Sequence, residues 1–310
     1  MPVAVPSQDV FIFVFIFNLV NMLRYGTNHR KTMKNMVRYY SESNDAFNIM
    51  RKEAIMTNYE IMKIAMQQSA IDSCCQADDF LCTDNKVVIS GKQAAARRYL
   101  ELPFYCDLTS YGNNIVASVS EDLVDIVRNY IDKYPIEHCF ETPNLLTLME
   151  KLKPFDLNIC FMAEYFLPDI NSIKPIACKY HLKIMYPNDF AGCYLPEWSN
   201  ALCENRKHLD VLAVGAFENE KLVGLAGCSA DCDTMWQIGV DVLPEYRRQG
   251  IASSLTSILA TEILNRKKVP FYCCAWSNIK SAGNAIKSGF LPAWVQITAK
   301  KNDFIDNMNK

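Results

Sequence analysis

The stretch MWQIGVDVLPEYRRQGIASSLTSILATEILNR, residues 235–266, decides the fold of the second half of the chain. Its first part, WQIGVDV, contains the β-branched residues typical of a strand, and Pro244 ends that pattern. After the short loop EYRRQG, apolar residues recur every three to four positions, which predicts a helix with one face against a sheet. The predicted order is therefore strand, glycine-containing loop and helix.

This order favours an anion site at the start of the helix. Gly250 lets a ligand approach the backbone closely, and the N–H groups of residues 250–253 have no partner inside the helix. Together with Arg247 and Arg248 they suit a pyrophosphate. Neither a Walker loop nor a GxGxxG fingerprint is present. Ordinary helix capping with solvated arginines is the alternative interpretation.

The next stretch makes that alternative weaker. A second apolar strand, VPFYCCAW, ends before Ser277 and Asn278, and a short helix over 281–288 leads to Gly289 and Phe290. The pattern R-x-x-G-x-A at residues 247–252, the Asn after the next strand and the later Gly-Phe resemble the GNAT acetyltransferase superfamily. The resemblance covers about 125 residues, from roughly Tyr180 to Lys300.

The resemblance implies an α/β (α+β) fold, with a mixed, mostly antiparallel and splayed sheet flanked by helices. It also implies acetyl-CoA as cosubstrate, with the pantetheine arm alongside the first strand and the pyrophosphate on the loop and helix start. Asn278 matches an Asn that contacts the cofactor arm near the thioester. The implied cofactor-binding residues are Val240, Asp241, Val242, Arg247, Arg248, Gln249, Gly250, Ile251, Ala252, Ser253 and Asn278.

The implied activity is direct acetyl transfer to a primary amine of a small molecule or peptide. The position of the family's usual Tyr is Ala285, and the strand positions that often hold a Glu base are Trp236 and Cys273. We therefore take Asn278 and Glu197 as catalytic candidates. Glu204 is a second candidate base, although a solvated helix charge is the simpler interpretation of either Glu. Because the usual positions are empty, a weakly catalytic or regulatory acyl-CoA-binding module is the alternative function.

Other residues bear on the acceptor. Asp231 and Asp233 either bind a cationic amine or serve only as turn residues. Cys273 is either a low-pKa thiolate or, as is commoner for a Cys in an apolar strand, an inert thiol. The tryptophans either line an aromatic acceptor pocket or pack in the core, the simpler interpretation for each: Trp198, Trp236, Trp276 and Trp294.

The length of 310 residues favours two domains. We divide the chain into a leader with a basic segment over 1–44, an N-terminal α/β, degenerate GNAT-like domain over 45–170, and the GNAT domain over 176–300. The expected elements of the N-terminal domain are a helix over 45–72, a hairpin around Gly112, helices over 120–134 and from Thr142, and a strand over 157–166. A helical region is expected over 188–208 in the GNAT domain.

Composition and charge exclude several classes. With 50% hydrophobic and 21% charged residues the chain is globular rather than disordered, and a net charge of −2 with dispersed Lys and Arg argues against nucleic acid as a partner. The 13 Cys lie in apolar runs without zinc-ligand spacing, which predicts reduced thiols in a cytoplasmic protein and no metal.

The apolar run over 10–23, VFIFVFIFNLVNML, is short of the ~20 residues that span a bilayer. It lacks the basic start and small-residue cleavage site of a signal peptide. We expect a soluble protein without stable membrane insertion. The apolar surface of the run needs cover, which favours a homodimer contact.

Overall fold

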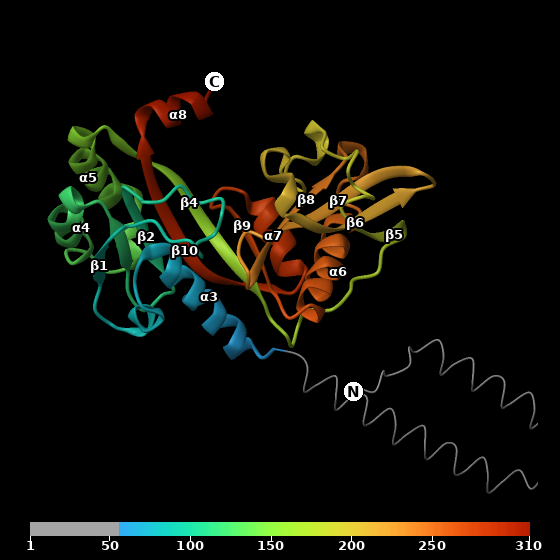
Figure 1. The fold of residues 1–310 in the computed structure, drawn as a ribbon, viewed down its shortest axis with the longest axis horizontal. Coiled ribbons are helices and arrows are strands. Elements are labelled where there is room, and N and C mark those ends of the chain that lie inside the picture. Colours follow the sequence, from blue (N-terminus) through green and yellow to red (C-terminus); the bar gives the residue numbers. More distant parts are fainter. Residues whose placement is uncertain (1–55) are drawn as a thin grey trace, which may run out of the picture. The chain divides into compact units, whose positions relative to one another are not determined.

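Ten strands form one continuous sheet in the computed structural model, which describes residues 56–310 (Figure 1). Their order across the sheet is β1-β3-β2-β10-β4-β9-β8-β7-β6-β5, and only the β1–β3 and β8–β9 pairs are parallel. The strands are β1 Lys86–Ile89, β2 Cys106–Ser110, β3 Val116–Val119, β4 Leu157–Pro168, β5 His181–Met185, β6 Asp210–Glu218, β7 Lys221–Ser229, β8 Met235–Val242, β9 Val269–Ala275 and β10 Phe290–Lys301. The expected mixed, mostly antiparallel sheet with flanking helices is confirmed.

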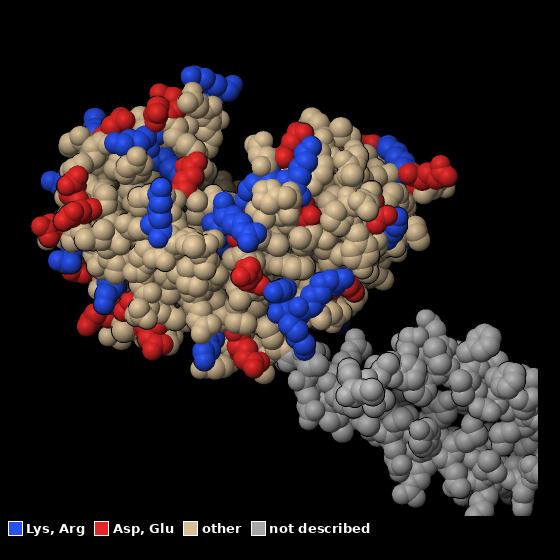
Figure 2. All heavy atoms as spheres, in the orientation of Figure 1, with Lys and Arg blue, Asp and Glu red and all other residues tan. Residues whose placement is uncertain are grey.

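Six α-helices accompany the sheet within the described residues. They are α3 Asn58–Ser73, α4 Val124–Ile131, α5 Thr142–Leu152, α6 Ile251–Asn265, α7 Ile279–Lys287 and α8 Asn302–Met308. In Figure 1, α4 and α5 lie at the β1 end of the sheet, whereas α6 lies beside β6, β7 and β8. Basic and acidic side chains are interspersed over the face drawn in Figure 2.

The helix expected over 45–72 is seen from Asn58, and residues 45–55 lie outside the described part. Thr57 forms a capping box with Glu60: the Glu60 backbone N–H donates to the Thr57 hydroxyl, and the Thr57 N–H donates to the Glu60 carboxylate at 2.7 Å. This reciprocal pairing satisfies two N–H groups that the first turn leaves without partners, and so stabilises the helix start there.

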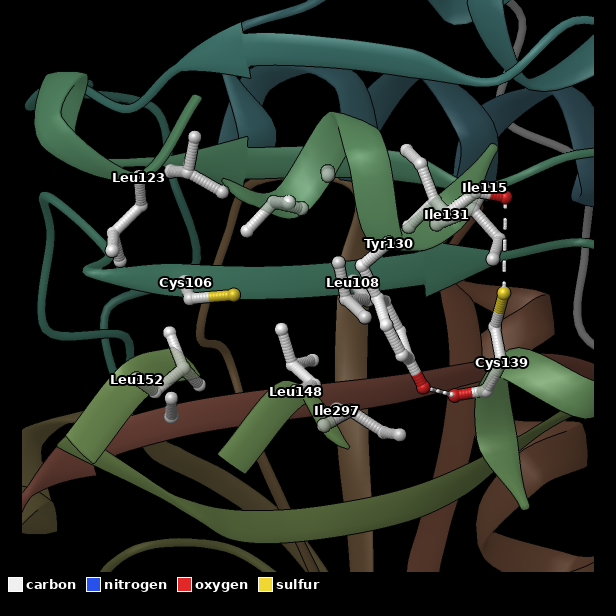
Figure 3. Packing of buried hydrophobic residues seen from close by; sticks show 14 of the residues in the cluster. Cys106, Leu108, Ile115, Leu123, Tyr130, Ile131, Cys139, Leu148, Leu152 and Ile297 are labelled. Carbon is white, nitrogen blue, oxygen red and sulfur yellow. Dashed lines mark hydrogen bonds between the residues drawn. The ribbon is translucent and has the colours of Figure 1, made fainter. Parts of the chain in front are cut away.

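The N-terminal part of the sheet packs against α4 and α5 (Figure 3). The apolar stripe expected on the helix over 120–134 is confirmed, because Leu123, Val127 and Ile131 are completely buried. The Tyr130 hydroxyl donates to the Cys139 carbonyl oxygen at 2.7 Å, so the polar end of this buried ring has a partner. The expected hairpin is also present as β2 and β3, with Gly112 at φ 100° in the connecting turn.

The C-terminal part packs around α6. Its predicted apolar face is buried at Ile251, Leu255, Leu259 and Ile263, each at most 1% exposed, against β6, β7, β8 and β9. Burying four such side chains contributes on the order of 6–12 kcal/mol of hydrophobic free energy before conformational entropy is subtracted. The helix start at residue 251 is therefore held firmly beside β8.

The prediction of a helical region over 188–208 is wrong. The segment contains only 3₁₀ turns at Pro196–Trp198 and Glu204–Leu209. Gly192 and Pro196 disfavour a continuous α-helix, and carboxylates compete for the backbone N–H groups. Asp210, for example, accepts from the Cys203 N–H at 2.9 Å.

Strand β10 comes from the C-terminal end of the chain but lies among N-terminal strands. It pairs with β2 on one side and with β4 on the other. The sheet therefore continues across the expected boundary between 45–170 and 176–300, and the division into two domains stays a prediction.

The 13 Cys all lie within the described residues and none forms a disulfide. Five are buried, which agrees with their expected role as small apolar side chains: Cys106, Cys139, Cys228, Cys232 and Cys274. Across residues 56–310 no cluster of three or more side chains has the composition of a metal site. In the same range no helix has the length and apolarity to cross a membrane, and the run over 10–23 lies outside it.

A buried ion pair fixes the chain after α3 against the sheet. Arg97 and Asp72 contact each other with 3% of each side chain exposed. The Arg97 guanidinium lies 5.5 Å from the ring centroid of Trp294 and 5.6 Å from that of Phe271. These cation–π contacts and the paired charge compensate the desolvation of Arg97.

A second buried carboxyl lies in β2. Asp107 accepts hydrogen bonds from Thr298 at 2.6 Å, Gln296 at 2.8 Å and Thr109 at 3.1 Å. Burial nevertheless raises the pKa of Asp107 from 3.8 to about 6, because desolvation disfavours the carboxylate more than these bonds favour it.

This shift predicts a pH-dependent stability. Between about pH 4 and 6 the folded protein holds a proton on Asp107 that the unfolded chain has lost, so this group's contribution to stability falls as pH rises. Asp107→Asn should remove that fall, which amounts to about 2 kcal/mol between pH 4 and 6 for a shift of roughly two pKa units. Urea unfolding at pH 4, 5 and 6 measures it. If the free energy of unfolding fell equally with pH in the wild type and the variant, the raised pKa of Asp107 would be contradicted.

Candidate functional site

Strands β8 and β9 diverge halfway along their length. Their parallel pairing runs from Met235 with Val269 to Ile238 with Tyr272 and then stops. Beyond that point β8 stays paired with β7 as far as Val242, and β9 stays paired with β4. Each strand therefore follows its outer neighbour, and a cavity of about 820 Å³, here called the splay cavity, opens between them.

The loop over 199–201 presses on β8 where the strands part. A Cβ at Gly239 would lie 1.8 Å from the Asn200 carbonyl oxygen, so only glycine allows this approach. The Asp241 carboxylate accepts from the backbone N–H of Asn200 at 2.8 Å and of Ala201 at 3.0 Å, and from the Asn200 amide at 2.7 Å. These contacts hold the loop and the free half of β8 together.

A smaller pocket of about 260 Å³ lies at the N-terminus of α6 and is here called the helix-end pocket. Arg248 at φ 61° and Gly250 at φ 81° both take the left-handed conformation, which turns the loop tightly into the helix. The first N–H groups of α6 have no partner inside the helix. Four cations and no carboxylate line the pocket: Arg247, Arg248, Lys280 and Lys287.

The two cavities adjoin along a shared wall. Six residues line both of them: Val242, Arg247, Arg248, Ala252, Lys280 and Asn284. The Arg247 side chain bonds the Val242 carbonyl through Nε at 2.9 Å, which fixes the loop to the end of β8. An elongated ligand with an anionic end fits this arrangement, because free N–H groups and cations lie at one end only.

Most of the predicted cofactor-binding residues come together here. Ten of the eleven line one or both cavities: Val240, Asp241, Val242, Arg247, Arg248, Gly250, Ile251, Ala252, Ser253 and Asn278. The side chain of Gln249 turns away and accepts a hydrogen bond from the Tyr180 hydroxyl at 2.7 Å. Gln249 lines neither cavity.

Residues 178–290 match the family model of the acetyltransferase (GNAT) family. This segment is a GNAT domain. The matched range includes the diverging strands, the loop and α6, so the family assignment and the geometry refer to the same residues. No curated protein matches the chain.

Solved structures of the family also match the described fold at low identity. A GCN5-related N-acetyltransferase from Sphaerobacter thermophilus has a TM-score of 0.40 and 12% identity over 61% of this chain and 72% of its own. A GCN5-related N-acetyltransferase-like protein from Streptococcus suis has a TM-score of 0.38 and 19% identity over 51% of this chain and 68% of its own. A GNAT-family acetyltransferase from Colwellia psychrerythraea has a TM-score of 0.37 and 13% identity over 46% of this chain and 57% of its own. All three TM-scores are below 0.5.

Asn278 begins α7 at the edge of the splay cavity. Its Oδ1 accepts from the Ser281 N–H at 3.2 Å and caps the helix, which leaves the amide Nδ2 free to donate to a ligand. Ser281 also lies 2.8 Å from the Tyr272 hydroxyl, and both line the cavity. Burial raises the pKa of Tyr272, so the hydroxyl stays protonated.

The usual base positions of the GNAT domain hold no base. Trp236 packs with the α6 core, and burial raises the pKa of Cys273 to about 11, so its thiol is protonated and inert. The amide of Gln237 donates to the Cys273 sulfur at 3.1 Å. Sequence reasoning missed Gln237 and Tyr272. Both are polar residues in the apolar strands next to the motif residues, and this was the signal that could have found them.

The replacement candidates lie away from the cavity. Glu197 is exposed on the 3₁₀ turn that buries Trp198, and Glu204 is exposed and pairs with Lys207 at 3.1 Å. Asp231 is completely buried and pairs with Arg206 at 2.8 Å, so it is not open to an amine substrate. Neither Glu and neither of Asp231 and Asp233 lines the splay cavity.

The contact at Gly239 can be tested directly. Gly239→Ala should lower the free energy of unfolding by about 1–3 kcal/mol, because its methyl group would force the 199–201 loop away from β8. Urea unfolding measures this loss. Gly192→Ala is the matched control, since its Cβ would meet nothing within 4 Å, and it should change stability by less than about 0.5 kcal/mol. Equal stabilities of the two variants would contradict the role of Gly239.

Proposed function

We propose that the GNAT domain binds acetyl-CoA and transfers its acetyl group to a primary amine of a small molecule or peptide. The observation that carries this proposal is the continuity of the splay cavity with the cationic helix-end pocket. Acyl-CoA has the matching distribution of charge, because its phosphates lie at one end and its neutral pantetheine arm at the other.

The residues suggest how the cofactor is held. Its pyrophosphate would accept from the first N–H groups of α6 and pair with Arg247, Arg248 and Lys280. The arm would lie along the free half of β8, whose backbone loses its β9 partner beyond Ile238. A pantetheine amide can replace that partner because backbone N–H and C=O groups need hydrogen bonds. The Asn278 Nδ2 would donate to the arm.

The reaction balances without a further reagent. The amine nitrogen attacks the thioester carbonyl carbon, the C–N bond forms and the C–S bond breaks. The neutral nitrogen gives up one proton to water, the departing thiolate takes up one from a donor side chain, and solvent returns a proton to that donor. We assign the donor role to Tyr272, which lines the splay cavity with a protonated hydroxyl beside Ser281.

One observation favours the alternative of a non-catalytic acyl-CoA-binding module. Asp241 supplies the only carboxylate among the described residues that line the splay cavity, and its oxygens are engaged by Asn200 and Ala201. Glu197 stays a proposed base only if the acceptor reaches the exposed turn on which it lies.

The cofactor proposal predicts the effect of Gly250→Glu. This change should weaken acetyl-CoA binding at least a hundredfold, because a Cβ there points into open space at the pyrophosphate position and the added charge repels it. Isothermal titration calorimetry measures the affinity. Gly250→Ala is the matched control. Like Gly250→Glu it places a side chain on the left-handed backbone at φ 81°, but it adds no charge and should retain most acetyl-CoA binding. Unchanged affinity of Gly250→Glu would refute the proposed site.

A thiol-release assay separates the two functions. With acetyl-CoA and a panel of primary amines, an acetyltransferase releases one free thiol per acetylated amine. We expect turnover in wild type, and at least a tenfold lower kcat for Tyr272→Phe at unchanged acetyl-CoA affinity. Tight acetyl-CoA binding with no thiol release from any amine would support the binding module.

A further inference from the structure

A third cavity, here called the acidic groove, lies beside the splay cavity and has about 400 Å³ of space. Phe140 and Trp276 form one wall, with their ring centroids 6.2 Å apart. Trp276 is 36% exposed, which is unusual for so large an aromatic ring, whereas Phe140 is only 6% exposed. Ile136 and Pro292 add further apolar surface.

The charge of the groove is the opposite of that in the helix-end pocket. Glu137 and Glu164 line it, and no Lys, Arg or His does. Within residues 56–310 neither carboxylate forms an ion pair, although nine other ion pairs occur there. Glu164 is half-buried in the middle of β4, and a cation in the groove would supply the counter-charge that it lacks.

The groove adjoins the splay cavity across one strand pair. Glu164 in β4 lies directly opposite Cys274 in β9, so their side chains share one face of the sheet at a Cβ separation of about 5 Å. Cys274 lines the splay cavity, and Glu164 lines the groove. Burial raises the pKa of Cys274, and the negative charge of Glu164 adds to that rise. Trp276 comes two residues after Cys274, before Asn278.

We infer that the acidic groove binds the acceptor, a cationic amine with an apolar or aromatic body. Its ammonium would pair with Glu164 and Glu137, and its body would pack on Trp276 and Phe140. The ammonium would give one proton to solvent before the neutral nitrogen attacks the thioester. An aromatic ring beside unpaired carboxylates is suited to an organic cation through both charge and cation–π attraction. The inference rests on the proposed acetyl transfer and gives the class of its substrate.

The test uses benzyltrimethylammonium, which has the charge and an aromatic body but no N–H to acetylate. Calorimetric titration of the full chain should show binding that Glu164→Gln weakens at least tenfold and Trp276→Leu at least fivefold. Glu121→Gln removes a carboxylate outside the groove and is the matched control, with binding expected as in wild type. The thermal unfolding midpoint of each variant checks that it is folded.

A second titration separates this inference from the function on which it rests. Each variant should bind acetyl-CoA as wild type does, and benzyltrimethylammonium should compete with benzylamine in the thiol-release assay. If the wild-type protein did not bind acetyl-CoA, the proposed function would be refuted. The titration with benzyltrimethylammonium tests cation binding in the acidic groove independently of that result. No cation binding by wild type, equal binding by Glu164→Gln, or turnover of benzylamine without competition would each overturn the inference.

Discussion

The divergence of β8 and β9 is the constraint on which the site depends. Each strand is held by its outer neighbour, β7 or β4, so the two cannot remain paired after Ile238 and Tyr272. Gly239 and Asp241 then fix the 199–201 loop to the free half of β8. The backbone groups exposed by the divergence need partners, and an amide-containing ligand can provide them. The same geometry places the start of α6 at the open end of the cavity.

Charge divides the surroundings of these strands into two regions. Arginines and lysines surround the start of α6, whereas Glu137 and Glu164 lie in the groove beyond β9. The described chain thus has a cationic region and an acidic region on either side of β9. Such a separation suits the binding of an anionic cofactor and a cationic acceptor, because each is attracted to its own region.

The sequence predicted the strand, loop and helix of residues 235–266 and the helix start after Asn278, because these motif residues are close together in the chain. Gly250 and Asn278 each end a loop and begin a helix, and a Gly-containing loop or an Asn cap is readable from local pattern. The helix expected over 188–208 failed because partners distant in sequence, such as Asp241, take up backbone N–H groups there. Glu164 could not be found either, since only the pairing of β4 with β9 brings it beside Cys274.

Hydrogen–deuterium exchange with and without acetyl-CoA tests the central claim most directly, because it reports on the free half of β8 itself. On binding, amides in peptides covering residues 239–253 and 273–284 should exchange more slowly, since the cofactor would occupy both the strand edge and the helix start. Peptides covering β2 and β3 should exchange as before. Unchanged exchange over 239–253 at saturating acetyl-CoA would contradict the account.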